Sequence, residues 1–173
     1  MAHDGRAIAN LVLDIADSCQ ISIRPLKLQK IIYFEHGWWL ALESKPLIRQ
    51  AIEAWEFGPV VRVFYDAFKN TPPNTPISTR ATYSDLMLGK DGAISASLNA
   101  EELSLFKKIF LHYAQIKEYD LVEMTHVAGG PWETIRREKV FSLHSIIGNQ
   151  SIKGHFDMFK NHFEAFPNIL PYH

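Results

Sequence analysis

An acidic and a basic side chain, Glu35 and His36, stand next to each other inside a long apolar stretch of the sequence. A buried glutamate beside a histidine can perform general acid–base catalysis, because burial can bring both pKa values close to the working pH. Together with His126 they could form a hydrolytic site. The alternative is that Glu35 and His36 occupy the one polar stripe of an otherwise apolar helix and have no chemical role.

The other residue types that support catalysis do not form a motif. The remaining histidines are scattered, and none belongs to an HExxH helix pair. The single cysteine, Cys19, excludes a site with several thiolates, and its apolar neighbours predict a buried, unreactive thiol. Residues 89–92 lack the spacing of a phosphate-binding loop, and Pro131 removes a donor that an anion would need at residues 129–131. We therefore expect no metal, no cofactor and no enzyme activity.

The composition is that of an ordinary globular protein. Of its 173 residues, 47% are hydrophobic and 21% charged, which excludes a disordered chain. The formal net charge of −1 gives no long-range attraction for nucleic acid, so we do not expect a nucleic-acid partner. No window approaches the roughly 20 apolar residues of a membrane span, and no secretory signal begins the sequence. We expect a cytoplasmic protein with no membrane partner.

Helical periodicity predicts the first two elements. Apolar residues at helical spacing predict a helix over residues 8–15, for which Asp4 is a suitable N-cap. Pro25 suits the first turn of a second helix, which continues to Leu42 and is broken by Lys45-Pro46. That helix is apolar on more than one side, so we expect it to run through the centre of the fold.

The middle of the chain predicts short strands and loops. A hairpin of two strands is expected between residues 47 and 57, with a polar turn at residues 49–50. Gly58 should end the second strand, and Pro59 should start a helix that carries Phe64. Residues 70–76 predict an exposed loop and residues 89–92 a turn, and Ile94 with Leu98 is a candidate third strand.

The C-terminal half predicts further helices. Asn99 and Glu102 form a capping box for a helix that reaches Gln115. A shorter helix over residues 119–124 should stop at Gly129-Gly130-Pro131, and helical spacing resumes over residues 132–140. A last helix should span residues 152–163, before Pro167 and Pro171. We expect one domain, residues 1–173, of the mainly α (α+β) class: a helical bundle with a small antiparallel β-sheet of two or three short strands.

Aromatic residues are abundant, at 12% of the chain. Neighbours on a helix point about 100° apart, so the pairs Tyr33-Phe34 and Trp38-Trp39 cannot all face one side. Either other elements wrap this helix completely, or some rings are exposed. Exposed aromatic rings near a charged side chain are typical of protein–protein hot spots, which favours a protein partner.

Four segments, in order along the chain, resemble the signatures of the Panacea domain of SocA-like antitoxins, a family that includes phage-associated GepA-like proteins. They are the Lys-Leu-Gln-Lys helix segment, a hairpin segment that ends in a Trp, an aromatic-Gly-Pro-Val step, and a Thr-His pair followed by Pro-Trp. The residues that carry the resemblance, and that are also candidates for contact with a toxin, are Leu28, Gln29, Lys30, Tyr33, Trp55, Phe57, Gly58, Pro59, Val60, Tyr65, Thr125, His126, Pro131 and Trp132.

The resemblance implies an antitoxin of a bacterial or prophage toxin–antitoxin system. Such a protein neutralises a cognate protein toxin, encoded by the adjacent gene, by direct binding. One relative acts instead as an adaptor that hands its toxin to a protease, so a proteolytic adaptor is the alternative, and the hydrolase that uses Glu35, His36 and His126 is a second one.

Segments 55–60 and 125–132 are expected to meet in a shared corner. Gly58 and Gly129 would permit the sharp turns, Pro59 and Pro131 would start helices, and the Trp rings would fill the space beneath. His126 would tie the corner together with a hydrogen bond. Two interpretations of these residues stay open, a structural scaffold and a set of toxin contacts.

Overall fold

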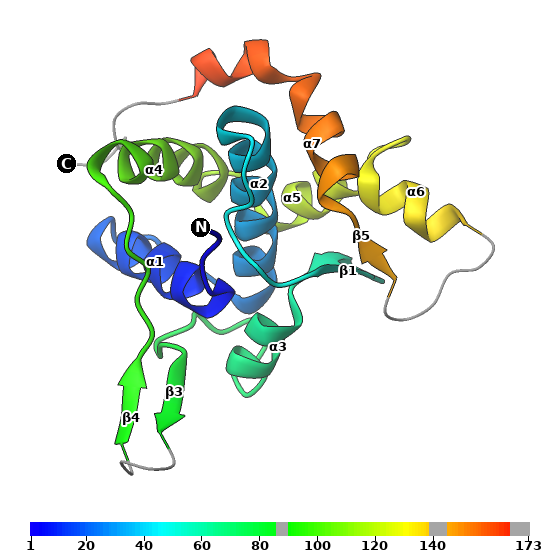
Figure 1. The fold of residues 1–173 in the computed structure, drawn as a ribbon. Helices are drawn as coiled ribbons and strands as arrows, with labels where there is room; N and C mark the ends of the chain where they lie inside the picture. The colour runs from blue at the N-terminus through cyan, green and yellow to red at the C-terminus, as the bar shows by residue number, and fades with distance from the viewer. Residues whose placement is uncertain (86–89, 139–144, 167–173) are drawn as a thin grey trace.

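One long helix, α2 (Pro25–Glu43), lies at the centre of the structure, with the other helices arranged around it (Figure 1). The computed structural model describes residues 1–85, 90–138 and 145–166. Pro25 occupies the first turn of α2, and residues 28–41 are all buried. The predicted central helix is therefore confirmed. It ends where Ser44 adopts a left-handed conformation, one residue before Lys45.

Three further helices begin at the signals that the sequence offers. Asp4 caps the first one by accepting a hydrogen bond from the Arg6 amide, and Asn99 forms the expected capping box with Glu102. Pro131 stands in the first turn of its helix. Besides α2, the described helices are α1 (Gly5–Ser18), α3 (Arg62–Phe68), α4 (Ala100–Ala114), α5 (Glu118–Thr125), α6 (Pro131–Arg137), α7 (Asn149–Asp157) and the 3-10 helix η1 (Lys160–Ala165).

The aromatic pairs of α2 are enclosed on all sides. Tyr33, Phe34, Trp38 and Trp39 are each at most 5% exposed. α4 and α7 supply much of the cover: Tyr113 stacks on Phe34, and its hydroxyl accepts a hydrogen bond of 2.7 Å from Trp38 Nε1. The four rings therefore belong to the core.

A small antiparallel sheet contains β1 (Ile52–Trp55), β2 (Gly58–Val60) and β5 (Ile146–Ile147), in the order β2-β1-β5. The predicted hairpin within residues 47–57 is wrong, because β1 pairs with the residues that follow it, Ala54 opposite Pro59. Pro59 consequently lies in a strand, and α3 starts only at Arg62. A proline fits at this edge of the sheet because it has no amide hydrogen to leave unpaired.

A second hairpin, β3 (Thr82–Asp85) with β4 (Lys90–Ala93), extends away from the helices (Figure 1). The predicted turn is wrong for its last three positions, since residues 90–92 belong to β4, whereas Gly89 lies outside the described residues. The predicted strand of Ile94 and Leu98 is also wrong. The buried Asn10 amide fixes the base of this hairpin: it bonds the backbone N–H and C=O of Ala81 and the C=O of Ile94. The Ile94 amide also donates to the Ala81 carbonyl at 3.4 Å.

The C-terminal helix is shorter than predicted. α7 ends at Asp157, and the chain continues as η1, so Phe156 and Phe163 lie on different elements. Val140, Pro167 and Pro171 lie outside the described residues. The loop over residues 70–76 is largely exposed, as predicted, but Cys19 is only half-buried. The mainly α fold with small antiparallel sheets is confirmed.

Candidate protein-binding surface

The start of α2 holds the β1–β2 hairpin by two neighbouring side chains. The Gln29 amide makes a pair of hydrogen bonds with Val61: it accepts from the Val61 amide at 2.9 Å and donates to the Val61 carbonyl at 3.2 Å. Lys30 Nζ donates to the Pro59 carbonyl at 3.1 Å. These bonds satisfy the outer edge of β2 with side chains in place of another strand, and they fix the hairpin to the core.

Gly58 allows this close contact. Its backbone has φ of +100°, a conformation that L side chains rarely adopt. A Cβ atom at this position would lie 2.6 Å from Lys30 Nζ and 2.7 Å from Thr125 Oγ1. Thr125 Oγ1 itself donates to the Val122 carbonyl at 2.7 Å, near the end of α5. The glycine is therefore required both by its backbone angle and by the two side chains that enclose it.

The second predicted segment closes the corner through Trp132. Its Nε1 donates to the Trp55 carbonyl at 2.7 Å, which links α6 to the end of β1. The role predicted for His126 is wrong: among the described residues its buried Nε2 has no hydrogen-bond partner. The imidazole instead stacks on Trp132, with 3.8 Å between ring centroids and 14° between planes. Gly129 has the expected positive φ, +73°.

Burial governs the electrostatics of the corner. It lowers the pKa of Lys30 to about 7, a shift that the charge of Glu118 partly offsets. The pKa of His126 is also lowered, first by burial and then by the charge of Lys30. Burial therefore disfavours the charged forms of both Lys30 and His126, which suits a structural role better than binding of an anion.

Two of the predicted residues lie outside this enclosed corner. Phe57, at the turn of the hairpin, is 64% exposed, and Tyr65 on α3 is 48% exposed. Tyr65 contacts Trp55 with 5.0 Å between ring centroids, and the guanidinium of Arg62 lies over the same Trp55 ring at 5.3 Å. The hairpin and α3 together thus present exposed aromatic rings beside a charged side chain.

These rings border an apolar groove of about 570 Å³ between the start of α2, the hairpin and α3. We call it the hairpin groove. Its charged lining residues are Glu56 and Lys69, and its main apolar lining residues are Leu28, Trp55, Phe57, Val60, Tyr65 and Phe68.

The predicted site residues therefore divide into two sets. Gln29, Lys30, Gly58, Pro59, Thr125 and Trp132 are joined by the contacts above, whereas Phe57 and Tyr65 face solvent. Tyr33 belongs to neither set: it is buried against Phe34 and Phe156, where burial raises the pKa of its hydroxyl.

A second apolar groove was missed by the sequence prediction. It also measures about 570 Å³ and lies between α2, α4, the end of α5 and the α7–η1 segment. We call it the α7 groove. Met158 at its rim is 70% exposed, and Phe159 is 39% exposed. The sequence predicts a single helix over residues 152–163, whereas Met158 and Phe159 lie between α7 and η1. The apolar residues of segment 152–163 extend beyond one face of a helix, and this excess was the sequence signal that could have identified the exposed surface.

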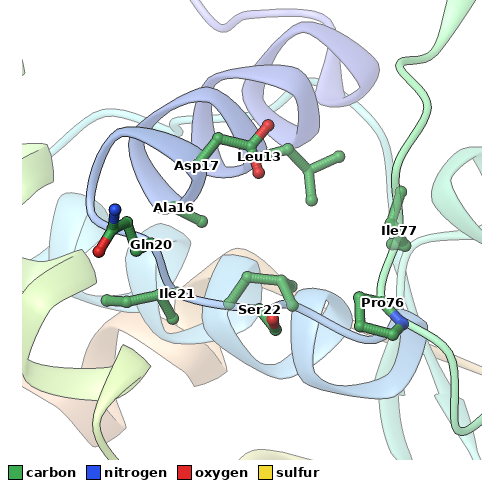
Figure 2. A pocket seen from close by; sticks show the side chains of 9 residues that line it. Leu13, Ala16, Asp17, Gln20, Ile21, Ser22, Pro76 and Ile77 are labelled. Carbon is green, nitrogen blue, oxygen red and sulfur yellow. The ribbon is translucent and has the colours of Figure 1, made fainter.

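A third hollow, about 230 Å³, lies away from the family segments (Figure 2). Figure 2 shows Leu13 and Ala16 of α1 on one side, Ser22 opposite them, and Pro76 with Ile77 closing one end. None of the predicted site residues lines it. We therefore do not assign it a role in partner binding.

The structure does not bring Glu35, His36 and His126 together as a hydrolytic site. Within the described part of the chain, both Glu35 oxygens lack a hydrogen-bond partner, so neither histidine is bonded to that carboxyl. His36 Nε2 pairs with Asn149 Oδ1 at 2.9 Å, and its Nδ1 accepts from the Ile48 amide. None of the three residues lines any of the three hollows described above.

Residues 1–85, 90–138 and 145–166 also lack two further features. No cluster of three or more His, Cys, Asp or Glu side chains in these ranges could hold a metal ion. No helix in these ranges has both the length and the apolar character needed to cross a membrane.

Comparison with known proteins identifies the family. The profile described as "Antitoxin SocA-like, Panacea domain" matches residues 28–133. The chain therefore belongs to this family of SocA-like antitoxins.

A named relative is Antitoxin SocA of Caulobacter vibrioides (strain NA1000 / CB15N), to which the chain is 36% identical over 132 residues. That match covers 76% of this chain and 70% of the relative. No solved structure matches the chain. The family resemblance predicted from four segments is thus confirmed, and residues 28–133 include both halves of the corner.

Proposed function

We propose that this protein is a cytoplasmic, non-enzymatic antitoxin that neutralises a cognate protein toxin, encoded by the adjacent gene, by direct binding. Family membership supports the antitoxin role. The observation that carries the binding mode is the 64% exposure of Phe57 on a hairpin that Gln29 and Lys30 fix to the core.

A fixed hairpin favours binding because little conformational entropy is lost when its side chains meet a partner. Aromatic side chains that become fully buried in a complex contribute disproportionately to affinity. Phe57 and Tyr65 stand at the rim of the hairpin groove, whose lining is apolar. We therefore assign the corner to the scaffold and the hairpin groove to the toxin contact.

Co-expression with the adjacent gene tests this function. The wild-type protein should restore growth and co-purify with the toxin, whereas Phe57→Ala and Tyr65→Ala should weaken binding by at least about tenfold each. Tyr119→Ala is the matched control, because Tyr119 is 72% exposed on α5 and does not line the groove. An adjacent gene product that is harmless alone, or that stays toxic beside the wild-type protein, would disprove the antitoxin role.

A second candidate, a proteolytic adaptor, is favoured by one observation: the hairpin groove and the α7 groove share no lining residue. Two separate apolar surfaces could bind a toxin and a protease at the same time. An adaptor should shorten the half-life of the toxin in cells, and Met158→Ala with Phe159→Ala should abolish that effect while toxin binding persists. A half-life that is unchanged or longer in the presence of the wild-type protein would exclude this candidate.

A further inference from the structure

Glu35 has an ionisable side chain, but it lies in the buried core, where a charge is unfavourable. It lies in the middle of α2, is 0% exposed, and both of its carboxyl oxygens lack a hydrogen-bond partner among the described residues. An ionised carboxylate in such a place would lack the hydrogen bonds that stabilise its charge, which is strongly unfavourable. The neutral form avoids most of that cost, since only a weakly polar group is then buried.

The charges around Glu35 do not offset this burial. On α4, burial raises the pKa of the Tyr113 hydroxyl, and this hydroxyl already accepts a hydrogen bond from Trp38. On α2 itself, His36 is bonded to Asn149 and Lys30 to Pro59. The charged side chains of neighbouring elements are engaged in surface ion pairs: Asp14 and Asp17 with Arg80, Glu118 with Arg24, Glu102 with Lys45, and Lys153 with Asp157.

We propose that Glu35 makes the folding of this protein proton-linked: the folded core holds its carboxyl in the neutral form, and the unfolded chain releases that proton into water. Burial raises the pKa of this carboxyl well above its model-compound value of 4.5. The folded state thus binds one more proton than the unfolded state over the interval between the two pKa values. Stability is fully present below the unfolded pKa and falls as the pH rises towards the folded pKa.

The consequence is a pH-sensitive element in the core. Over that interval the contribution of Glu35 lowers the folding equilibrium constant about tenfold for each pH unit. Because both Glu35 oxygens lack a partner within residues 1–85, 90–138 and 145–166, this one side chain couples the population of unfolded protein, and hence its exposure to proteases, to the pH of the solution.

The test compares urea denaturation of the wild type and of Glu35→Gln between about pH 5.5 and 8. The variant cannot ionise at this position, so the ratio of its folding constant to that of the wild type should rise by about tenfold per pH unit until the pH reaches the folded pKa of Glu35. His36, Lys30 and the other titrating groups are present in both proteins, so their effects cancel in this ratio. A ratio that does not change with pH would overturn the proposal, because it would mean that Glu35 is ionised, or hydrated, in the folded protein.

Proton uptake provides a second measurement. Refolding from urea at pH 6 to 7 in weakly buffered solution should take up more protons for the wild type than for Glu35→Gln, by up to about one per molecule, as reported by an indicator dye. If Glu35→Gln fails to fold, Glu35→Met takes its place. Glu101→Gln is the control, since Glu101 is an exposed glutamate on α4, and it should change neither the pH slope nor the uptake. Equal uptake by the wild type and the Glu35 variants would refute the proposal.

Discussion

Polar side chains are buried both in the first turns of α2 and in its middle. The two groups differ in how they are bonded to the rest of the protein. Gln29 and Lys30 bond the backbone of the β1–β2 hairpin and thereby fix its position. Glu35, about one and a half turns further on, has no such bond within the described part of the chain. The comparison shows that a buried polar group in this fold can be a structural connection or a site of proton linkage, depending on its partners.

The largest effect should come from a substitution that separates the connected side chains from the hairpin. Gly58→Ala should lower the free energy of unfolding by about 4 kcal/mol, because the new Cβ meets Lys30 Nζ and Thr125 Oγ1 in an unfavourable backbone conformation. Urea denaturation measures the change. Gly129→Ala is the matched control: Gly129 also has a positive φ, but its Cβ would meet nothing within 4 Å, so about 1 kcal/mol is expected. Similar losses of unfolding free energy in both variants would show that the backbone angle alone, and not the contact with Lys30 and Thr125, determines the cost.

The next effect tests the connection made by Gln29. Gln29→Leu keeps the size of the side chain but removes its polar atoms, so the buried N–H of Val61 loses its partner, which should cost about 2 kcal/mol. The Val61 C=O loses only one of its hydrogen bonds, because it still accepts from the Phe64 amide at 3.0 Å. Hydrogen exchange at the Val61 amide should rise in parallel with the loss of stability. Retention of slow exchange in a variant that has lost stability would show that the edge of β2 is protected by something other than the amide.

Lys30 tests the comparison through the pH dependence of folding stability. The effect of Lys30 on this dependence is opposite in sign to that of Glu35. Burial lowers the pKa of Lys30 to about 7, so above that pH the unfolded chain binds more protons than the folded one. The wild type should therefore gain stability relative to Lys30→Met by up to about 1.4 kcal/mol per pH unit from pH 7 towards pH 10. Denaturation at several pH values gives this slope, and a constant difference between the two proteins would contradict it.

The sequence predicts the helices better than the strands, for a physical reason that these residues illustrate. Pro25, Asp4 and the pair Asn99 and Glu102 act within a few residues of their own helix, so local spacing identifies them. The partner of β1 depends on the positive φ of Gly58 and on Gln29 and Lys30, which lie about thirty residues earlier in the chain. Local patterns contain no information on such contacts.

The same limit applies to the site. The sequence identifies the residues that meet at the corner, because the family resemblance groups them. It could not distinguish the enclosed Trp132 from the exposed Phe57, since exposure depends on which elements cover each ring. The hydrogen bond expected from His126 was wrong because stacking on Trp132 fixes its ring in a different way.

The smallest effect tests the second half of the corner. Trp132→Phe removes the donor to the Trp55 carbonyl and keeps an aromatic ring beneath His126, so the free energy of unfolding should fall by about 1 kcal/mol. Trp55→Phe is the control. Its Nε1 donates to Glu53, a carboxylate that keeps both of its hydrogen bonds from Arg62, so a smaller loss is expected. An equal loss in the two variants, measured by urea denaturation, would mean that the link from α6 to β1 contributes no more than a surface contact, and that Gln29 and Lys30 alone hold the hairpin in place.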